Sequence, residues 1–217
     1  METVSEMKSL ESLIQESESL IQWLDQQIDG VSMPENPRNR LAGGCLYVAM
    51  EHQKAIILLV ANRLCGSAFA LTRLLFEAYV RGIWLHRCAD DNELKKYTTD
   101  DVPKFYRLLE SVETLEGHQD KVLSTLKNRV WSALNGYAHT GMHQIARQQT
   151  EATIEPNYEY DEIAEVINFA NGMGFLAAIA TCELGNNVEL LNDIYKKMKA
   201  HWDADSGQEN GSKHQDF

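Results

Sequence analysis

The amino-acid sequence predicts an all-α protein, a single-domain bundle of about six to seven helices. Only four of the 217 residues are proline, and the strict alternation of apolar and polar residues that marks strands is almost absent. Apolar residues instead recur at spacings of three and four, as in amphipathic helices. With 44% hydrophobic residues, the chain can bury a substantial core. No repeat or linker divides it, so we expect one domain over residues 1–203.

The first three helices follow from apolar periodicity and from the residues that interrupt it. A first helix should end near Gly30, since glycine favours the position just past a helix C-terminus. A loop containing Pro34 and Pro37 precedes a second helix over residues 38–64, and Gly66-Ser67 precede a third over about 68–88. The first helix presents an apolar face made of Leu10, Leu13, Ile14, Ile21, Leu24 and Ile28.

The second half of the chain also reads as helices separated by polar loops. Pro103 suits the first turn of a helix, where its missing N–H loses no hydrogen bond. Gly136 and Gly141 are expected to kink a helix that starts near Gln119 and runs towards His139. The polar residues 204–217 cannot bury enough apolar area to offset the ordering entropy, which predicts a disordered tail. The expected helices cover residues 103–115, 119–139, 160–184 and 188–202, with a loop at 150–157.

Cysteine usage and hydropathy predict a cytoplasmic protein. The four cysteines include no CxxC pair, and no secretory signal pattern opens the chain. The longest apolar run, Ala55–Ala61, is far shorter than the roughly 18 residues that a membrane helix needs. We therefore expect reduced thiols and no membrane segment.

The net charge of −12 argues against a protein that coats nucleic acid. Residues 1–37 and 148–217 are strongly acidic, whereas residues 38–147 carry a small excess of basic side chains. This distribution fits either an anion site within a solvated acidic exterior or acidic ends that serve only solubility.

The third helix is apolar nearly all round, which predicts a place in the middle of the bundle. It nevertheless carries Arg73, Glu77 and Arg81, which lie with Trp84 within about 80° of one another on a helical wheel. Buried charges must be paired to be tolerated. The stripe is therefore either an internal Arg–Glu–Arg salt-bridge set, or a site where Glu77 orients an arginine that binds an anionic ligand.

A second polar group lies in residues 134–148, LNGYAHTGMHQIARQ. If this run is helical, Asn135, His139, His143 and Arg147 form one stripe, because residues four apart are neighbours on a helix. Further candidate ligand-binding side chains in the same stretch are Tyr137, Thr140 and Gln144.

Three roles are open to His139. It can be a structural histidine, either hydrogen-bonded in the core or exposed on a solvated helix face; it can be a catalytic or ligand-binding group; or it can be a metal ligand. The HxxxH pair with His143 has ligand spacing, but no Glu follows His139 as in HExxH, and the spacing names no third ligand. We therefore expect no metal site and no cofactor. The motifs GxGxxG, GxxxxGK[ST] and GxSxG are also missing from the sequence.

The run LTRLLFEAYVRGIWL at 71–85, followed by LNGYAHTGMHQ at 134–144, resembles a group of uncharacterised bacterial helical proteins that looks related to HEPN domains. The resemblance implies a helical bundle, commonly dimeric. Many HEPN proteins are metal-independent ribonucleases in toxin–antitoxin or phage-defence systems. Their motif places a histidine four to six residues after an arginine, whereas here the arginine nearest upstream of His139 is Arg129, ten residues away.

Two functional hypotheses follow. In the first, the protein is a HEPN-like ribonuclease or toxin-type effector: His139 moves a proton, Arg73 or Arg147 replaces the motif arginine, and Glu77 and Asn135 orient them. In the second, the bundle binds a small anion such as a nucleotide, or a partner protein, without catalysis. A purely structural role for the Arg73–Glu77–Arg81 stripe stays open. The resemblance and the apolar face of the first helix predict a homodimer.

Overall fold

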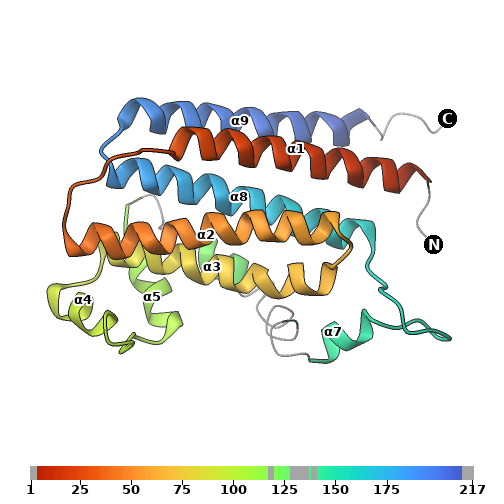
Figure 1. The fold of residues 1–217 in the computed structure, drawn as a ribbon, viewed down its shortest axis with the longest axis horizontal. Coiled ribbons are helices and arrows are strands. Elements are labelled where there is room, and N and C mark those ends of the chain that lie inside the picture. Colours follow the sequence, from red (N-terminus) through yellow and green to blue (C-terminus); the bar gives the residue numbers. More distant parts are fainter. Residues whose placement is uncertain (1–3, 117–119, 128–136, 138–140, 212–217) are drawn as a thin grey trace.

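The computed structural model describes residues 4–116, 120–127, 137 and 141–211; of residues 4–8, 143 and 204–211 it describes only the backbone. Within these ranges all regular secondary structure is helical. The predicted all-α, single-domain bundle is therefore confirmed. Its long helices are α1 (Val4–Ile28), α2 (Pro37–Ala61), α3 (Cys65–Arg87), α8 (Tyr160–Leu184) and α9 (Val188–Gly211) (Figure 1).

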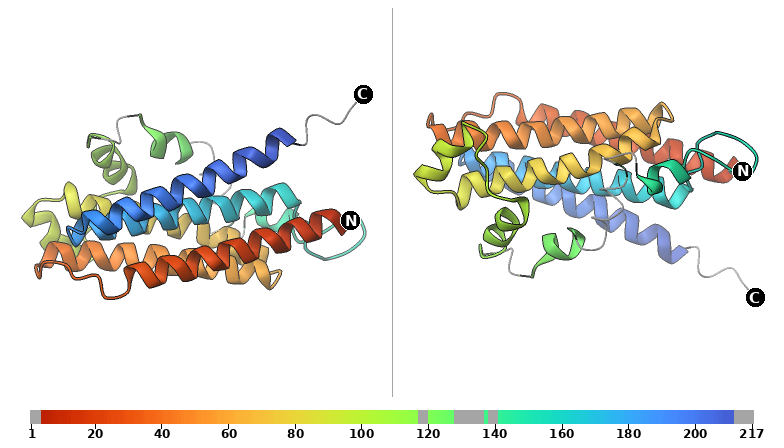
Figure 2. Two further views of the ribbon diagram at one scale, coloured as in Figure 1. Left: turned by 90° about the horizontal axis from the view of Figure 1, so that it is seen from above. Right: turned by 90° about the horizontal axis from the view of Figure 1, so that it is seen from below.

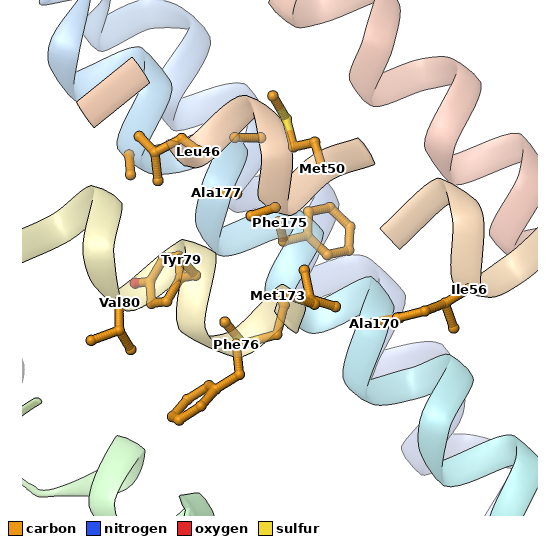
Figure 3. Close-up of a cluster of buried hydrophobic side chains, with 14 of the residues drawn as sticks. Leu46, Met50, Ile56, Phe76, Tyr79, Val80, Ala170, Met173, Phe175 and Ala177 are labelled. Carbon is orange, nitrogen blue, oxygen red and sulfur yellow. The ribbon is translucent and has the colours of Figure 1, made fainter. Parts of the chain in front are cut away.

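Helix α8 lies at the centre of the bundle. It packs against α1, α2, α3 and α9, and its side chains Met173 and Phe175 meet Leu46 of α2 and Phe76 of α3 in the core (Figure 3). The sequence pointed to the third helix as the central one, but α3 keeps one side open to solvent at Leu74. The apolar segment of α8 is more completely covered because helices pack on it from several directions (Figure 2).

Helices α2, α3 and α8 begin and end close to the predicted residues. At the start of α2 the side chain of Asn36 accepts a hydrogen bond from the backbone N–H of Asn39 at 2.8 Å, and Pro37 occupies the first turn. Glu159 and Glu162 form a capping box at the start of α8, whose bounds equal the predicted range 160–184.

Two short helices follow α3 in the chain. The sequence missed α4 (Asp91–Tyr97), although Asp90 and Glu93 form a capping box there. A helix of under two turns leaves too little apolar periodicity to detect. Helix α5 (Phe105–Val112) corresponds to the predicted 103–115 and packs on α3, with the rings of Phe76 and Phe105 centred 5.8 Å apart.

The expected single helical stripe over residues 134–148 is wrong. Residues 122–127 are helical, but Gly141 has an extended backbone, with φ −76° and ψ 178°, and a separate helix, α7 (Met142–Ala146), follows it. Glycine costs a helix interior conformational entropy, so the chain breaks there rather than kinks. Helix α7 therefore does not continue a helix across Gly141, as one stripe over residues 134–148 would require.

The C-terminal helix α9 continues to Gly211, into the segment 204–217 that the sequence predicts to be disordered. Once a helix is nucleated, each further residue adds one hydrogen bond at little cost, so a helix can extend into polar sequence. Residues 212–217 lie outside the described residues.

The apolar face of α1 is covered by its own bundle, which removes one basis for the predicted homodimer. Leu20 and Leu24 are buried, and α1 packs against α8 and α2. Figure 2 shows α1 lying along the outside of these helices.

Two helices, α2 and α8, are long and apolar enough to cross a membrane by length and composition. The apolar run of α2 is 39% buried in the bundle and that of α8 is 67% buried. A core helix of a bundle passes the same test, so this finding is weak evidence for a membrane protein.

Candidate functional site

Glu77 binds two arginines on α3, one turn before it and one turn after it. Its Oε1 accepts a hydrogen bond from Nε of Arg73 at 2.8 Å, and its Oε2 accepts one from Nη2 of Arg81 at 3.0 Å. The spacing of four residues places the three side chains in a row on one helix. The salt-bridge set, one of the two arrangements that the sequence predicted, is therefore present.

This set lies at the boundary of the bundle and not in a dry core. The Glu77 side chain is 13% exposed, whereas those of Arg73 and Arg81 are 23% and 36% exposed. The carboxylate is thus more protected from water than the guanidinium groups that hold it. Among the described residues, Nε of Arg81 is buried without a hydrogen-bond partner, which leaves a donor of this arginine unused.

The Arg81 end of the set meets Tyr97 of α4 and Cys45 of α2. The hydroxyl of Tyr97 and Sγ of Cys45 are 3.2 Å apart. Burial raises the pKa of Tyr97, and a hydrogen bond with Arg81 opposes that rise. Burial likewise raises the pKa of Cys45, so its thiol stays protonated near neutral pH. Sequence reasoning missed both residues because nothing local pairs side chains that are 52 positions apart.

The beginning of α3 meets a cluster of aromatic and amide side chains. The ring of Phe69 is centred 4.9 Å from that of Tyr137 and 5.1 Å from that of Tyr158. Nε2 of Gln144 donates to the carbonyl oxygen of Gly66 at 3.4 Å. A Cβ added at Gly66 would lie 2.9 Å from the hydroxyl of Tyr158, so glycine permits this close approach.

Tyr137 and Arg147 contact each other and other side chains of the bundle. The ring of Tyr137 is buried in the aromatic cluster, and burial raises the pKa of its hydroxyl despite a hydrogen bond with Arg147. The guanidinium of Arg147 forms an ion pair with Glu162 near the start of α8. The structure therefore places Arg147 with Glu162 and Tyr137, and not in the Arg73–Glu77–Arg81 set.

The remaining predicted site residues fall where the structure gives no side-chain position. Asn135, His139 and Thr140 lie outside the described residues, and for His143 only the helical backbone of α7 is described. The described residues contain no group of three or more His, Cys, Asp or Glu side chains arranged to hold a metal ion.

A groove of about 450 Å³ lies between the start of α2 and helix α4. Arg38, on its wall, donates from Nη1 to the carbonyl oxygens of Leu85 and Ala89 at the end of α3, at 2.9 and 2.6 Å. This arginine therefore serves chiefly as a cap for α3. The groove is lined by Asn36, Pro37, Arg38, Leu41, Asp91, Leu94, Lys95 and Thr98.

Comparison with known proteins gives a family but no activity. A family model described as a family of unknown function (DUF6988) matches residues 46–204, a range that runs from α2 to α9 and includes the Arg73–Glu77–Arg81 set. Searches of curated proteins and of solved structures found no match. The matched range covers well over half of the chain, and the protein therefore belongs to the family DUF6988.

Proposed function

We propose that the protein is a HEPN-like, metal-independent ribonuclease of the toxin or phage-defence kind, in which the Arg73–Glu77–Arg81 set holds a phosphate group of RNA. The observation that carries this proposal is the double engagement of Glu77, which fixes two guanidinium groups at the edge of the bundle. A guanidinium carries five N–H donors, and Glu77 takes one nitrogen of Arg81. Further donors of this half-exposed arginine suit bidentate contact with a phosphate.

His139 supplies the proton transfer in this proposal, because an imidazole titrates near neutral pH. The 2′-oxygen of RNA forms a bond to phosphorus, and the bond from phosphorus to the 5′-oxygen breaks. The proton of the 2′-hydroxyl is removed and a proton is delivered to the leaving oxygen, so the atoms balance without a further reactant. The resemblance of residues 71–85 and 134–144 to HEPN-related proteins supports the assignment of His139.

The test is incubation of the purified protein with labelled cellular RNA in excess chelator. We expect the wild type to cleave RNA, His139→Ala to abolish cleavage with an unchanged melting temperature, and Arg81→Ala to slow cleavage by about tenfold or more. Arg107→Ala is the matched control, because Arg107 is an exposed arginine of α5 whose described partner is Tyr106. RNA left intact by the wild type at every protein concentration would overturn the ribonuclease proposal.

The second candidate is non-enzymatic binding of a small anion such as a nucleotide. It is favoured by the net charge of −12, which disfavours binding of a long polyanion. The ion pair of Arg147 with Glu162 also engages one of the two arginines that could replace the motif arginine of a ribonuclease. Titration calorimetry with nucleotides distinguishes the two candidates: binding that Arg81→Ala weakens, together with intact RNA, supports this one.

A further inference from the structure

The last turn of α4 places the side chain of Tyr97 against α3, close to Arg81. Figure 1 shows α4 at the end of the bundle where α2 begins and α3 ends. The ring of Tyr97 is centred 6.5 Å from that of Trp84. Trp84 follows Arg81 by three residues, so the two lie on the same side of α3. Tyr97 therefore packs along the side of α3 that carries Arg81.

The hydroxyl of Tyr97 has partners on two other helices. Sγ of Cys45 on α2 lies 3.2 Å from it, and the guanidinium of Arg81 on α3 forms a hydrogen bond with it. Because an arginine side chain has only donors, the hydroxyl oxygen accepts from Arg81, and its own hydrogen can be donated to Sγ of Cys45. Burial raises the pKa of Tyr97, so the hydroxyl stays neutral near pH 7. Tyr97 thus holds Arg81 without cancelling its positive charge.

Arg81 is consequently held from two sides and still keeps donors for a ligand. Glu77 accepts from its Nη2, and its Nε is buried without a partner among the described residues. A guanidinium has five N–H donors; one goes to Glu77, one to Tyr97 and one is the buried Nε–H, so two are left. The Arg81 side chain is 36% exposed, so an anion in the solvent can reach it. A guanidinium that is already held in place loses less conformational freedom when it binds an anion.

We infer that Tyr97 is a positioning residue of the anion site: its hydroxyl holds the guanidinium of Arg81 from the α4 side, and Arg81 contacts the phosphate. This inference rests on the proposed role of the Arg73–Glu77–Arg81 set and adds helix α4 to that site. Since Tyr97 acts through Arg81, its effect on binding must disappear when Arg81 is removed.

The test measures the binding of two probes to the full chain at low ionic strength. One is a fluorescent 2′-O-methyl RNA oligonucleotide, followed by anisotropy, which has no free 2′-hydroxyl and so cannot be cleaved. The other is adenosine monophosphate, followed by titration calorimetry. Tyr97→Phe should weaken the binding of whichever probe the wild type binds by about three- to tenfold, the effect of one hydrogen bond. The variant keeps the ring on Trp84, so its melting temperature should stay within about 4 °C of the wild type.

Tyr106→Phe is the matched control for the loss of a tyrosine hydroxyl. Nε of Arg107 donates to the hydroxyl of Tyr106 at 3.2 Å, and Tyr106 is 43% exposed on α5. This change removes the same kind of arginine–tyrosine bond away from the Arg73–Glu77–Arg81 set. The Tyr106→Phe protein should bind both probes as the wild type does.

A double-mutant cycle with Arg81→Ala separates positioning from direct contact with the ligand. In the Arg81→Ala protein, the further change Tyr97→Phe should alter affinity by less than about twofold, because the residue through which it acts is gone. A Tyr97→Phe protein that binds as the wild type does would overturn the inference and leave the proposed function standing. So would losses that multiply in the double variant, since Tyr97 would then contact the ligand itself. A wild type that binds neither probe would overturn both. The expected pattern of binding together with intact RNA supports the inference and contradicts only the ribonuclease.

Discussion

Glu77 shows how one side chain can organise two others. Its two carboxylate oxygens bind guanidinium groups on both sides of it along α3, at 2.8 and 3.0 Å. Since the carboxylate is less exposed than its partners, the removal of its charge leaves two neighbouring cations that repel each other but can still reach water.

Replacement of Glu77 by Gln should lower the free energy of unfolding by about 1–2 kcal/mol, less than for a fully buried ion pair, because both arginines can regain hydration. Urea unfolding followed by circular dichroism measures this change. Glu110→Gln is the control: it removes the same charge from an exposed position on α5 and should alter stability by less than about 0.5 kcal/mol. Equal effects of the two variants would mean that the pairing of Glu77 contributes nothing to stability.

His86, in the last turn of α3, should make stability depend on pH. Burial, and then the nearby charge of Arg87, lower its pKa from the ordinary 6.5, while Glu183 opposes this effect. Its Nδ1 has no hydrogen-bond partner among the described residues. Below pH 6.5 the imidazole of residue 86 binds a proton more readily in the unfolded chain than in the folded chain. The contribution of neutral His86 to the free energy of unfolding is therefore fully present above that pH and is lost as the pH decreases towards the folded pKa.

The measurement for His86 is the melting temperature between pH 7.5 and 5. His86→Gln should melt with a smaller decrease over this range than the wild type. The pKa of His52 is also lowered by burial, so part of the decrease should persist in this variant. An identical decrease in wild type and variant would contradict the role of His86.

At the scale of the elements, a buried chain of polar side chains joins three helices. Nε2 of Gln53 in α2 donates to Oδ1 of Asn171 in α8 at 3.4 Å, and Nδ2 of Asn171 donates to Oγ of Ser17 in α1 at 2.8 Å. All three side chains are buried. Buried amides need partners, so these bonds favour one relative position of the helices. Gly174 of α8 makes room for Gln53, because an added Cβ would lie 2.0 Å from its Oε1.

The change Gly174→Ala should therefore destabilise the protein by about 1–3 kcal/mol through overpacking, even though alanine is the better helix former. Gly172→Ala is a matched control on the same helix, since its Cβ would meet only the ring of Trp202, at an ordinary 3.5 Å. That variant should be neutral or more stable by up to about 1 kcal/mol. Chemical unfolding measures both, and a Gly174→Ala protein as stable as Gly172→Ala would contradict the close packing of Gln53 on α8.

At the scale of the whole molecule, several helices enclose the core. The protein should therefore tolerate the loss of its polar C-terminal residues 204–217. A chain ending at Asp203 should keep the wild-type melting temperature within about 2 °C, because the polar residues beyond it can bury little apolar area. A chain ending at Asn187 should lose much stability, since it lacks the buried Ile194 and the helix that packs on α8. A large decrease in melting temperature for the first truncation would place part of segment 204–217 in the folded domain.

The sequence by itself determined the features that depend on neighbours along the chain. Apolar spacing predicted the long helices, and the bounds of α8 were predicted without error. The four-residue spacing of Arg73, Glu77 and Arg81 was enough to predict that they could pair, because helix geometry alone brings such residues together. The short helix α4 escaped prediction because it spans less than two turns.

Only the tertiary structure decided which surfaces and which distant side chains meet. It covered the apolar face of α1 with α8 and α2, left the outer side of α2 exposed, and brought Tyr97 and Cys45 to the end of the Arg73–Glu77–Arg81 set. In the structure Arg147 forms an ion pair with Glu162, and the extended backbone of Gly141 interrupts the helix that the expected stripe required. An apolar periodicity predicts that a helix face will be buried, but it does not predict which element will cover that face. A charged side chain can likewise pair with any opposite charge that the fold brings near. The choice depends on the path of the loops and on the packing of the whole bundle, which no local spacing encodes.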